Sequence, residues 1–207
     1  VRIDDMEGGR MATDHLIELG HERIAFIGAE PTNPLGYSPS RAREAGFRER
    51  MATAGLDVPD EYVLYCPYVH DLGADVSRRL FAPGRERPTA VFAASDAQAL
   101  GVFDAARGQG LEVPGDLSLV GFDDVEIARY VGLTTVRQPL YDLGRRAAEL
   151  LLDELSGEGL PAPPVVHTLD LQLVVRSTTT VPSDPGPHHP AANDNPTTSA
   201  SYGGTQL

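Results

Sequence analysis

The stretch that decides the fold is Leu117-Ser-Leu-Val-Gly-Phe-Asp-Asp124, an apolar run that ends in a glycine, an aromatic residue and two carboxylates. The run predicts a buried strand, since strands of a parallel sheet covered on both faces are almost continuously apolar. Its two acids then lie at the carboxyl edge of the sheet, where open α/β folds bind their ligands. A second stretch, Leu133-Thr-Thr-Val-Arg-Gln-Pro139, predicts a short extended crossover, because its proline disfavours helix.

Helical and strand patterns alternate through the rest of the chain to about residue 175. Asp71 is the predicted N-cap of the third helix, since a short side-chain oxygen there can accept from the first turn. The alternation favours a parallel sheet with helices on both faces. We predict helices over 6–19, 40–54, 72–81, 97–108, 124–130 and 141–156, and strands over 23–28, 62–66, 89–94, 117–122 and 165–175.

From about Thr179 onward, prolines lie among Ser, Thr, Gly, Asn and Asp without an apolar period. This composition predicts a disordered tail over residues 179–207. The tail contains the pair His188-His189. No third ligand has metal-site spacing, so we interpret the pair as solvated and expect no metal site.

Composition limits the classes of function. The chain has 207 residues, 41% of them hydrophobic, which is enough for a sizeable core. Its net charge of −13 argues against direct nucleic-acid binding, which requires clustered Lys and Arg. A single cysteine, Cys66, rules out an intrachain disulfide. No long apolar run or signal-peptide pattern is visible, so we expect no membrane contact and a cytoplasmic location.

No catalytic or cofactor motif is recognisable. The sequence contains no glycine-rich phosphate loop, no nucleophile elbow and no zinc-protease motif. We therefore expect neither a catalytic residue nor a cofactor, and expect that the protein is not an enzyme. Turnover of a bound ligand would overturn this expectation.

Polar residues instead recur at the predicted carboxyl ends of strands. Taken singly, several of them suit a helix N-cap better than a ligand contact. Their recurrence at one edge favours a small-molecule site, and carboxylates and amides suit the hydroxyls of a sugar. These residues are Asn33, Tyr68, Asp71, Ser95, Asp96, Asp123 and Asp124.

Several motifs, in order along the chain, resemble the LacI/GalR (lactose-repressor) family of bacterial transcription regulators. The two opening stretches resemble the hinge side of that family, and the resemblance runs from Val1 to about Thr178. The other motifs are Asp4-Asp5-Met-Glu-Gly-Gly-Arg10, His15-Leu-Ile-Glu-Leu-Gly-His-Glu-Arg-Ile24, Arg43-Glu-Ala-Gly-Phe47, Pro88-Thr-Ala-Val-Phe-Ala-Ala-Ser-Asp96, Gly110-Leu-Glu-Val-Pro-Gly-Asp116 and Leu173-Val-Val-Arg-Ser-Thr178.

The resemblance implies a periplasmic-binding-protein-like α/β fold with two parallel-sheet subdomains joined by three crossovers. Residues 1–21 and 139–168 would form part of the N-terminal subdomain, and residues 22–136 and 170–178 the C-terminal one. It further implies a small-molecule effector in the cleft, a homodimer, and operator DNA bound through a helix-turn-helix. No helix-turn-helix precedes Val1, so we expect these residues to be the carboxyl part of a longer regulator and the isolated chain to be poorly soluble or partly unfolded.

The resemblance also implies the effector contacts. Arg43 matches an arginine that grips the effector, although a surface salt bridge is the alternative interpretation. Asp123 matches an acid that accepts from the effector, and Gln138 and Leu140 lie on the crossover that faces the cleft. Three positions depart from the pattern. Gly132 replaces the proline that usually precedes Leu133-Thr-Thr, which loosens that loop. Ser95 stands where the family usually has Asn, and Leu72 stands where some members stack an aromatic ring on a sugar, so the effector stays open.

A second interpretation of the same fold is a sugar-binding protein of a transport system. The family motifs and the lack of a visible signal peptide favour the regulator.

Overall fold

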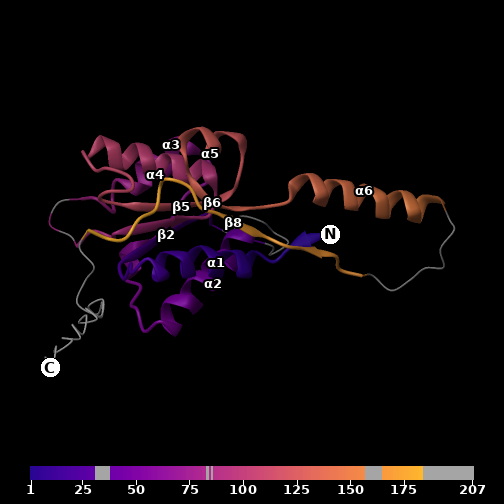
Figure 1. The fold of residues 1–207 in the computed structure, drawn as a ribbon, viewed down its shortest axis with the longest axis horizontal. Helices are drawn as coiled ribbons and strands as arrows, with labels where there is room; N and C mark the ends of the chain where they lie inside the picture. The colour runs from indigo at the N-terminus through magenta and orange to yellow at the C-terminus, as the bar shows by residue number, and fades with distance from the viewer. Residues whose placement is uncertain (31–37, 83, 85, 157–164, 184–207) are drawn as a thin grey trace, which may run out of the picture.

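The computed structural model describes residues 1–30, 38–82, 84, 86–156 and 165–183. Its central strands are β2 (Ile24–Gly28), β3 (Val63–Tyr65), β4 (Ala90–Ala93), β5 (Ser118–Asp123), β6 (Thr134–Arg137) and β8 (Gln172–Val174). They form one six-stranded sheet in the order β3-β2-β4-β5-β6-β8 (Figure 1). All run parallel except β8, which is antiparallel to β6. The α/β class with a mostly parallel sheet is therefore confirmed.

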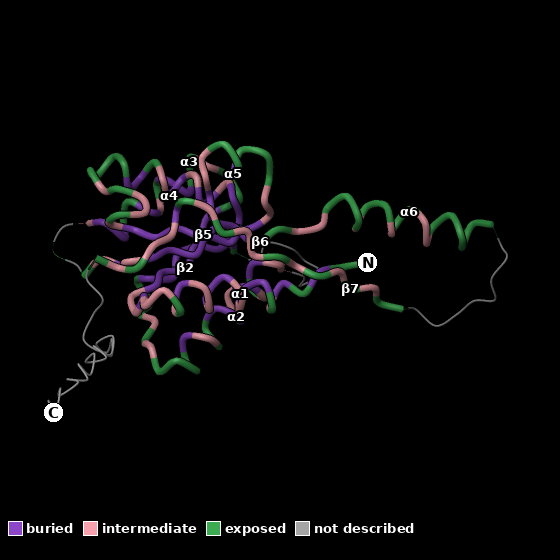
Figure 2. Tube along the Cα trace, in the orientation of Figure 1, coloured by how far each residue is buried: buried purple, intermediate pink, exposed green. Residues whose placement is uncertain are grey.

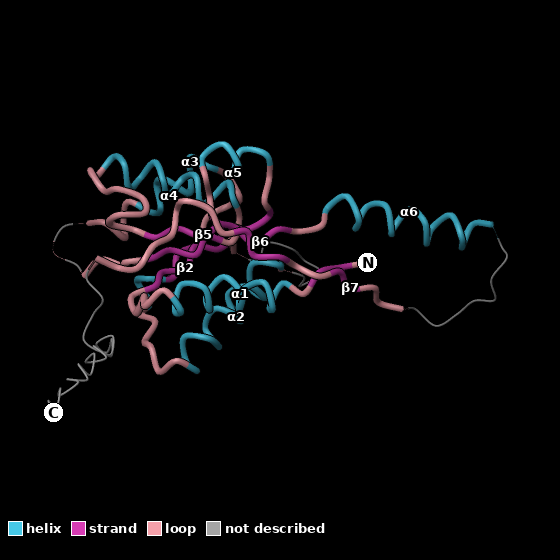
Figure 3. The backbone as a smooth tube through the Cα atoms, viewed as in Figure 1, coloured by secondary structure: helices cyan, strands magenta, loops and turns pink. Residues whose placement is uncertain are grey.

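Helices cover both faces of this sheet (Figure 3). One face carries α1 (Asp5–Glu18) and α2 (Pro39–Thr53). The other carries α3 (His70–Ser77), α4 (Asp96–Gly108) and α5 (Glu126–Val131). A short 3₁₀ turn, η1 (Asp60–Tyr62), leads into β3. The helices are predicted to within a few residues, but α3 begins after Val69, which makes no side-chain cap, so the predicted N-cap at Asp71 is wrong.

The core consists of two layers, one on each side of the sheet (Figure 2). Successive strand residues point to opposite faces, so β2 sends Ile27 to the α3 and α4 side and Phe26 to the α1 and α2 side. Phe26 stacks on Phe47 of α2 with ring centroids 5.5 Å apart, and it meets Phe92 of β4 edge-on at 5.4 Å. The larger aromatic side chains therefore fill the layer beneath α1 and α2.

Glycines allow α1 and α2 to pack backbone to backbone. A Cβ atom on Gly9 would lie 2.1 Å from the Arg43 carbonyl oxygen, and one on Gly46 would lie 2.1 Å from the Met6 carbonyl oxygen. This contact places α1 on the six-stranded sheet and not with a separate unit. The structure thus differs from the predicted division of the chain at residues 21 and 22, because the apolar face of α1 is buried against α2 and the sheet.

Replacing Gly9 with alanine is expected to lower the free energy of unfolding by about 3 kcal/mol, because the added methyl group must force the two helices apart. Gly144 offers a matched control, since it lies within a helix and nothing stands within 4 Å of a Cβ atom there. Gly144→Ala should leave stability unchanged or raise it by up to about 1 kcal/mol. Urea unfolding of both variants checks the packing, and equal stability would contradict it.

Helix α6 (Leu140–Ser156) extends away from the sheet and buries none of its residues (Figures 1 and 2). Near its base, β1 (Arg2–Ile3) pairs in parallel with β7 (Thr168–Leu169). The predicted strand over 165–175 is thus two short strands, β7 and β8, in different sheets. The assignment of α6 to a second subdomain stays a prediction.

The segment after β8 is hydrogen-bonded to the sheet as far as residue 180, although the tail was predicted to be disordered from residue 179. Thr178 donates to the Leu119 carbonyl oxygen over 2.7 Å, and the Thr180 amide donates to the Ser118 hydroxyl over 3.0 Å. Buried His21 contacts the Thr180 carbonyl oxygen through Nε2 at 2.8 Å and the Thr89 hydroxyl through Nδ1 at 2.9 Å. Residues 179 and 180 therefore belong to the ordered domain, which corrects the predicted start of the tail.

Both ring nitrogens of His21 thus have hydrogen-bond partners within the fold. Burial lowers the pKa of His21 from 6.5 to about 4. The ring is therefore neutral in the fold near neutral pH. The remainder of the predicted tail, including His188 and His189, and the predicted site residue Asn33 lie outside the described residues.

His21→Gln is expected to make stability less sensitive to acid. A lowered folded pKa contributes stability that is present above pH 6.5 and is lost as the pH falls toward about 4. Through this residue the wild type should lose about 2 kcal/mol between pH 7 and pH 5. The pKa of Asp96 is raised to about 6 and changes stability in the opposite sense, so the two proteins must be compared at both pH values. Identical pH dependence of urea unfolding would contradict this role.

Within the described part of the chain, no helix combines the length and the apolar character needed to span a bilayer.

Candidate small-molecule site

The strand order places a topological switch point at the carboxyl ends of β2 and β4. From β2 the chain passes to β3 on one side and then returns to β4 on the other. Connections that diverge in this way leave a switch point, and open α/β sheets bind ligands there. Ser40 of α2 lies at the end of β2, where its hydroxyl accepts a hydrogen bond from the Ala29 amide over 2.7 Å.

Arg43 crosses this switch point and is buried. Its Nε donates to Asp5 Oδ1 over 2.9 Å, and Nη2 lies 2.8 Å from the same oxygen. Its Nη1 donates to the carbonyl oxygen of Ala94, at the end of β4, over 2.5 Å. The guanidinium carbon lies 3.5 Å from the ring centroid of Phe122, a close cation–π contact. The alternative of a surface salt bridge is therefore wrong, because the pair is buried and ties α1 and α2 to β4.

Asp123 and Gln138 adjoin Arg43. Asp123 ends β5 with a positive φ of 116°, and its Oδ1 lies 3.9 Å from Arg43 Nη1. Gln138 Nε2 donates to the same oxygen over 2.5 Å. Burial raises the pKa of Asp123, and the Arg43 guanidinium opposes this rise. The structure thus brings three of the predicted site residues into one polar cluster.

Tyr68 lies beside this cluster at the carboxyl side of β3. It is 44% exposed. Burial raises the pKa of its hydroxyl, while the charge of Arg43 and a hydrogen bond to Ser40 oppose the rise. An aromatic ring with a polar tip at the rim of a polar cluster suits contact with a ligand.

Ser95 serves as the N-cap of α4. Its Oγ accepts from the Gln98 amide over 3.2 Å and donates to Gln98 Oε1 over 3.2 Å. Gln98 Nε2 in turn donates to the carbonyl oxygens of Gly28 and Cys66, each over 2.9 Å, and so joins the ends of β2 and β3. Ser95 follows Ala94, the partner of Arg43, but its hydroxyl is committed to capping, as the simpler interpretation predicted.

Two further acids at this edge support the frame. Buried Asp96 accepts from the Thr135 hydroxyl over 2.6 Å and from the Val125 amide over 2.8 Å. Asp124 lies 2.6 Å from both Arg137 and Arg176, whose hydrogen bonds and charges outweigh burial and lower its pKa. These bonds tie β4, β5 and β6 together and hold the end of β5 in place.

Leu72 and Leu140 lie on the surface, 42% and 54% exposed. Leu72 is in the first turns of α3, and Leu140 begins α6. Neither is part of the Arg43 cluster among the described contacts, and their predicted role in effector binding stays a prediction.

Asp5 is the site residue that sequence reasoning missed. It was visible only as the second acid of Asp4-Asp5, where Asp4 caps α1 by accepting from the Glu7 amide over 3.0 Å. Its partner lies 38 residues away along the chain. The sequence therefore carried no local signal for this pairing.

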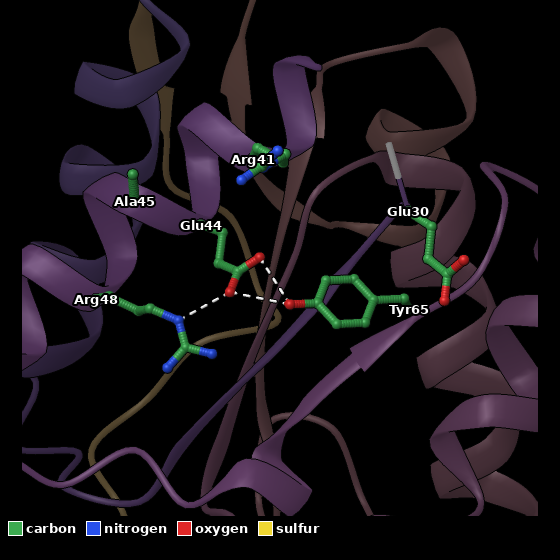
Figure 4. Close-up of a pocket in the computed structure, with 6 residues that line it drawn as sticks. All are labelled: Glu30, Arg41, Glu44, Ala45, Arg48 and Tyr65. Carbon is green, nitrogen blue, oxygen red and sulfur yellow. Dashed lines mark hydrogen bonds and ion pairs between the residues drawn. The ribbon is translucent and has the colours of Figure 1, made fainter. Parts of the chain in front are cut away.

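A pocket of about 580 Å³ lies elsewhere, between α2 and β3 (Figure 4). Three of its polar side chains bind one another. Tyr65 donates to Glu44 over 2.9 Å, and Arg48 Nε donates to the same carboxylate over 2.8 Å. We favour the switch point over this hollow as the ligand site. No group of three or more His, Cys, Asp or Glu side chains in the described ranges is arranged to hold a metal ion.

Comparison with known proteins identifies the domain. Residues 13–179 match the family model of the periplasmic binding protein-like domain. The chain is 38% identical to the ribose operon repressor of Escherichia coli K12 over 158 residues, which are 75% of this chain and 46% of the repressor. It is 33% identical to the E. coli K12 repressor CytR over 181 residues, which are 86% of this chain and 51% of that protein. The chain thus spans about half the length of these curated relatives.

Solved structures give the same result. A complex of the transcriptional regulator CelR with cellobiose superposes with a TM-score of 0.75 at 37% identity, over 85% of this chain and 52% of that one. A LacI-family regulator from Mycobacterium smegmatis superposes with a TM-score of 0.74 at 36% identity, over 87% and 66% of the two chains. The resemblance seen in the motifs is confirmed, and the chain belongs to the periplasmic binding protein-like domain family, in the form carried by LacI-family transcription regulators.

Proposed function

We propose that this chain is the effector-binding and dimerisation portion of a bacterial DNA-binding transcription regulator, and that the effector is a sugar or a related small metabolite. The observation that carries the proposal is the cluster of Arg43, Asp123 and Gln138 at the switch point of a LacI-family domain. Two relatives support the class of effector by name, the ribose operon repressor and CelR with cellobiose.

The chemistry of the cluster suits hydroxyl groups. Asp123 can accept from an effector hydroxyl, while Gln138 can both donate and accept. Tyr68 offers an apolar ring face to the carbon skeleton of a sugar. A few directed polar contacts beside an aromatic ring are what a small polar ligand requires.

Gln138 supplies a route from binding to regulation. It lies between β6 and α6, so it joins the sheet to the helix that extends from it. An effector that contacts both Asp123 and Gln138 favours one placement of α6 over others. Regulation then works as a population shift between arrangements that differ in effector affinity and in DNA affinity.

DNA binding is assigned to a helix-turn-helix outside these residues. A domain with a net charge of −13 repels phosphate, so operator contact requires a separate basic module. We further propose a homodimer in the cytoplasm, which matches the two-fold symmetry of operators. Sedimentation of the complete polypeptide tests the dimer.

The runner-up is a transport protein that captures a sugar. The regulators among the relatives favour our proposal over this one. An enzyme is a weaker alternative, because these relatives are regulators and no catalytic set was recognised in the sequence. Release of product from a bound ligand would favour the enzyme.

The test is operator binding by the complete natural polypeptide that carries these residues. Fluorescence anisotropy with DNA from its own upstream region should show binding, and one member of a panel of sugars and nucleosides should change the affinity. Sugar binding without any DNA binding would favour the transport protein and contradict the regulator.

A further inference from the structure

We propose that Asp5 is a specificity-determining residue of this site. Together, the negative charges of Asp5 and Asp123 exceed the positive charge of Arg43. The site therefore selects uncharged polyhydroxylated effectors and rejects anionic ones such as sugar phosphates and sugar acids. The inference rests on the proposed function and deepens it, because a LacI-type cleft with a buried arginine would otherwise suit an anion.

The N–H donors of Arg43 are already directed to groups of the protein. A guanidinium binds phosphate or carboxylate best when two parallel N–H bonds are presented together. In this protein the edge formed by Nε and Nη2 is turned to Asp5, at 2.9 and 2.8 Å. Nη1 is turned to the Ala94 carbonyl oxygen, and its nearest other acidic atom is Asp123 Oδ1 at 3.9 Å. Asp5 therefore occupies the paired edge of Nε and Nη2 that an anion would otherwise use.

Carboxylates outnumber arginines around the switch point. Three arginines and four carboxylates stand at this edge. Arg137 and Arg176 are both committed to Asp124, at 2.6 Å each. The part nearest Gln138 thus combines one arginine with two carboxylates. The arginines of the edge are Arg43, Arg137 and Arg176, and the acids are Asp5, Asp96, Asp123 and Asp124.

The consequence is discrimination by charge. An anion that approaches Arg43 Nη1 also comes close to the Asp123 carboxylate, which lies 3.9 Å from that atom and is largely buried, so screening of the repulsion by solvent is weak. A neutral hydroxyl can instead donate to Asp123 and accept from Gln138 without any charge being buried. The acidity of the whole chain acts in the same direction at longer range.

The first test uses the complete natural polypeptide and matched ligand pairs. D-ribose is compared with ribose 5-phosphate and ribonate, and cellobiose with cellobionate, by calorimetric titration. We expect the neutral member to bind and each anionic partner to bind at least about tenfold more weakly. An anionic partner that binds as tightly as the neutral sugar overturns the inference and leaves the proposed function standing. If neither class binds, nor any sugar or nucleoside of the wider panel, the proposed function is contradicted.

The second test needs no knowledge of the effector. Asp5→Asn keeps an oxygen that can accept from Arg43 Nε but removes the charge, so inorganic phosphate should bind this variant at least about tenfold more tightly than the wild type. Asp14→Asn is the control, because Asp14 pairs with Arg50 away from the switch point. Equal phosphate affinity in Asp5→Asn and wild type overturns the inference. If circular dichroism shows that Asp5→Asn does not fold, Asp123→Asn replaces it. This variant too should bind inorganic phosphate more tightly than the wild type.

Discussion

Arg43→Ala is expected to lower the free energy of unfolding by about 3–5 kcal/mol, the usual result of removing one partner of a buried ion pair. Asp5 is almost as buried as Arg43 and would lose the guanidinium that pairs with it. The Ala94 carbonyl oxygen would lose its donor, and Phe122 would lose the contact with its ring face. Urea or thermal unfolding of the complete polypeptide measures the loss.

Arg48→Ala provides the matched control. Arg48 is on the same helix and pairs with Glu44, but its side chain is 43% exposed. Exposed pairs of this kind contribute at most about 1 kcal/mol. If the two variants were equally stable, Arg43 would not hold α1 and α2 to the sheet. Because a large loss is expected, failure of Arg43→Ala to respond to an effector cannot by itself assign Arg43 to effector binding.

Asp123→Asn is expected to weaken effector binding by on the order of 10- to 100-fold, which corresponds to the loss of a hydrogen bond to a charged acceptor. Asparagine can still accept from Gln138, so the local geometry should survive. The pKa of Asp123 is raised by burial, so its charge is held in the fold at a cost near neutral pH. The variant should therefore be at least as stable as the wild type, and operator binding should be intact.

Asp142→Asn controls for the removal of one acid. Asp142 lies on α6, is exposed, and pairs with Arg145 at 3.4 Å. The effector affinity and the DNA affinity of the Asp142→Asn protein should match those of the wild type. Asp123→Asn proteins that bind effector normally would show that the cluster is structural. Loss of operator binding in Asp123→Asn would also show that the cluster is structural.

Local signals were enough to predict much of the fold. The strand ending at Asp123 was expected over 117–122 and is found over 118–123, because a buried parallel strand must be apolar on both faces. The clustering of Asp123 with Gln138 follows from the parallel order of the strands, which brings the ends of β5 and β6 to one edge. Arg43 was singled out only through the family resemblance.

Contacts between distant segments could not be predicted in this way. No local pattern shows that Asp5 pairs with Arg43, or that Gly9 and Gly46 allow two helices to touch. The placement of α1 on the six-stranded sheet depends on those contacts. The direction of β8 was also missed, since it depends on the path of the chain after β7 and not on the residues of the strand.

Capping was predicted correctly at Ser95 and wrongly at Asp71. Ser95 and Asp71 both precede or begin helices, and both have side chains that can cap. Ser95 does cap α4, whereas α3 starts one residue before Asp71, and Asp71 pairs with His70 at 2.8 Å instead.

The most direct measurement is a crystal structure of the complete polypeptide with the tightest-binding sugar of the panel. Our account predicts that the ligand lies at the carboxyl ends of β2, β4 and β5, with a hydroxyl within hydrogen-bond distance of Asp123 and of Gln138. Arg43 should remain paired with Asp5. A ligand in the hollow formed by Glu44, Arg48 and Tyr65, with the Asp123 cluster unchanged, would contradict it.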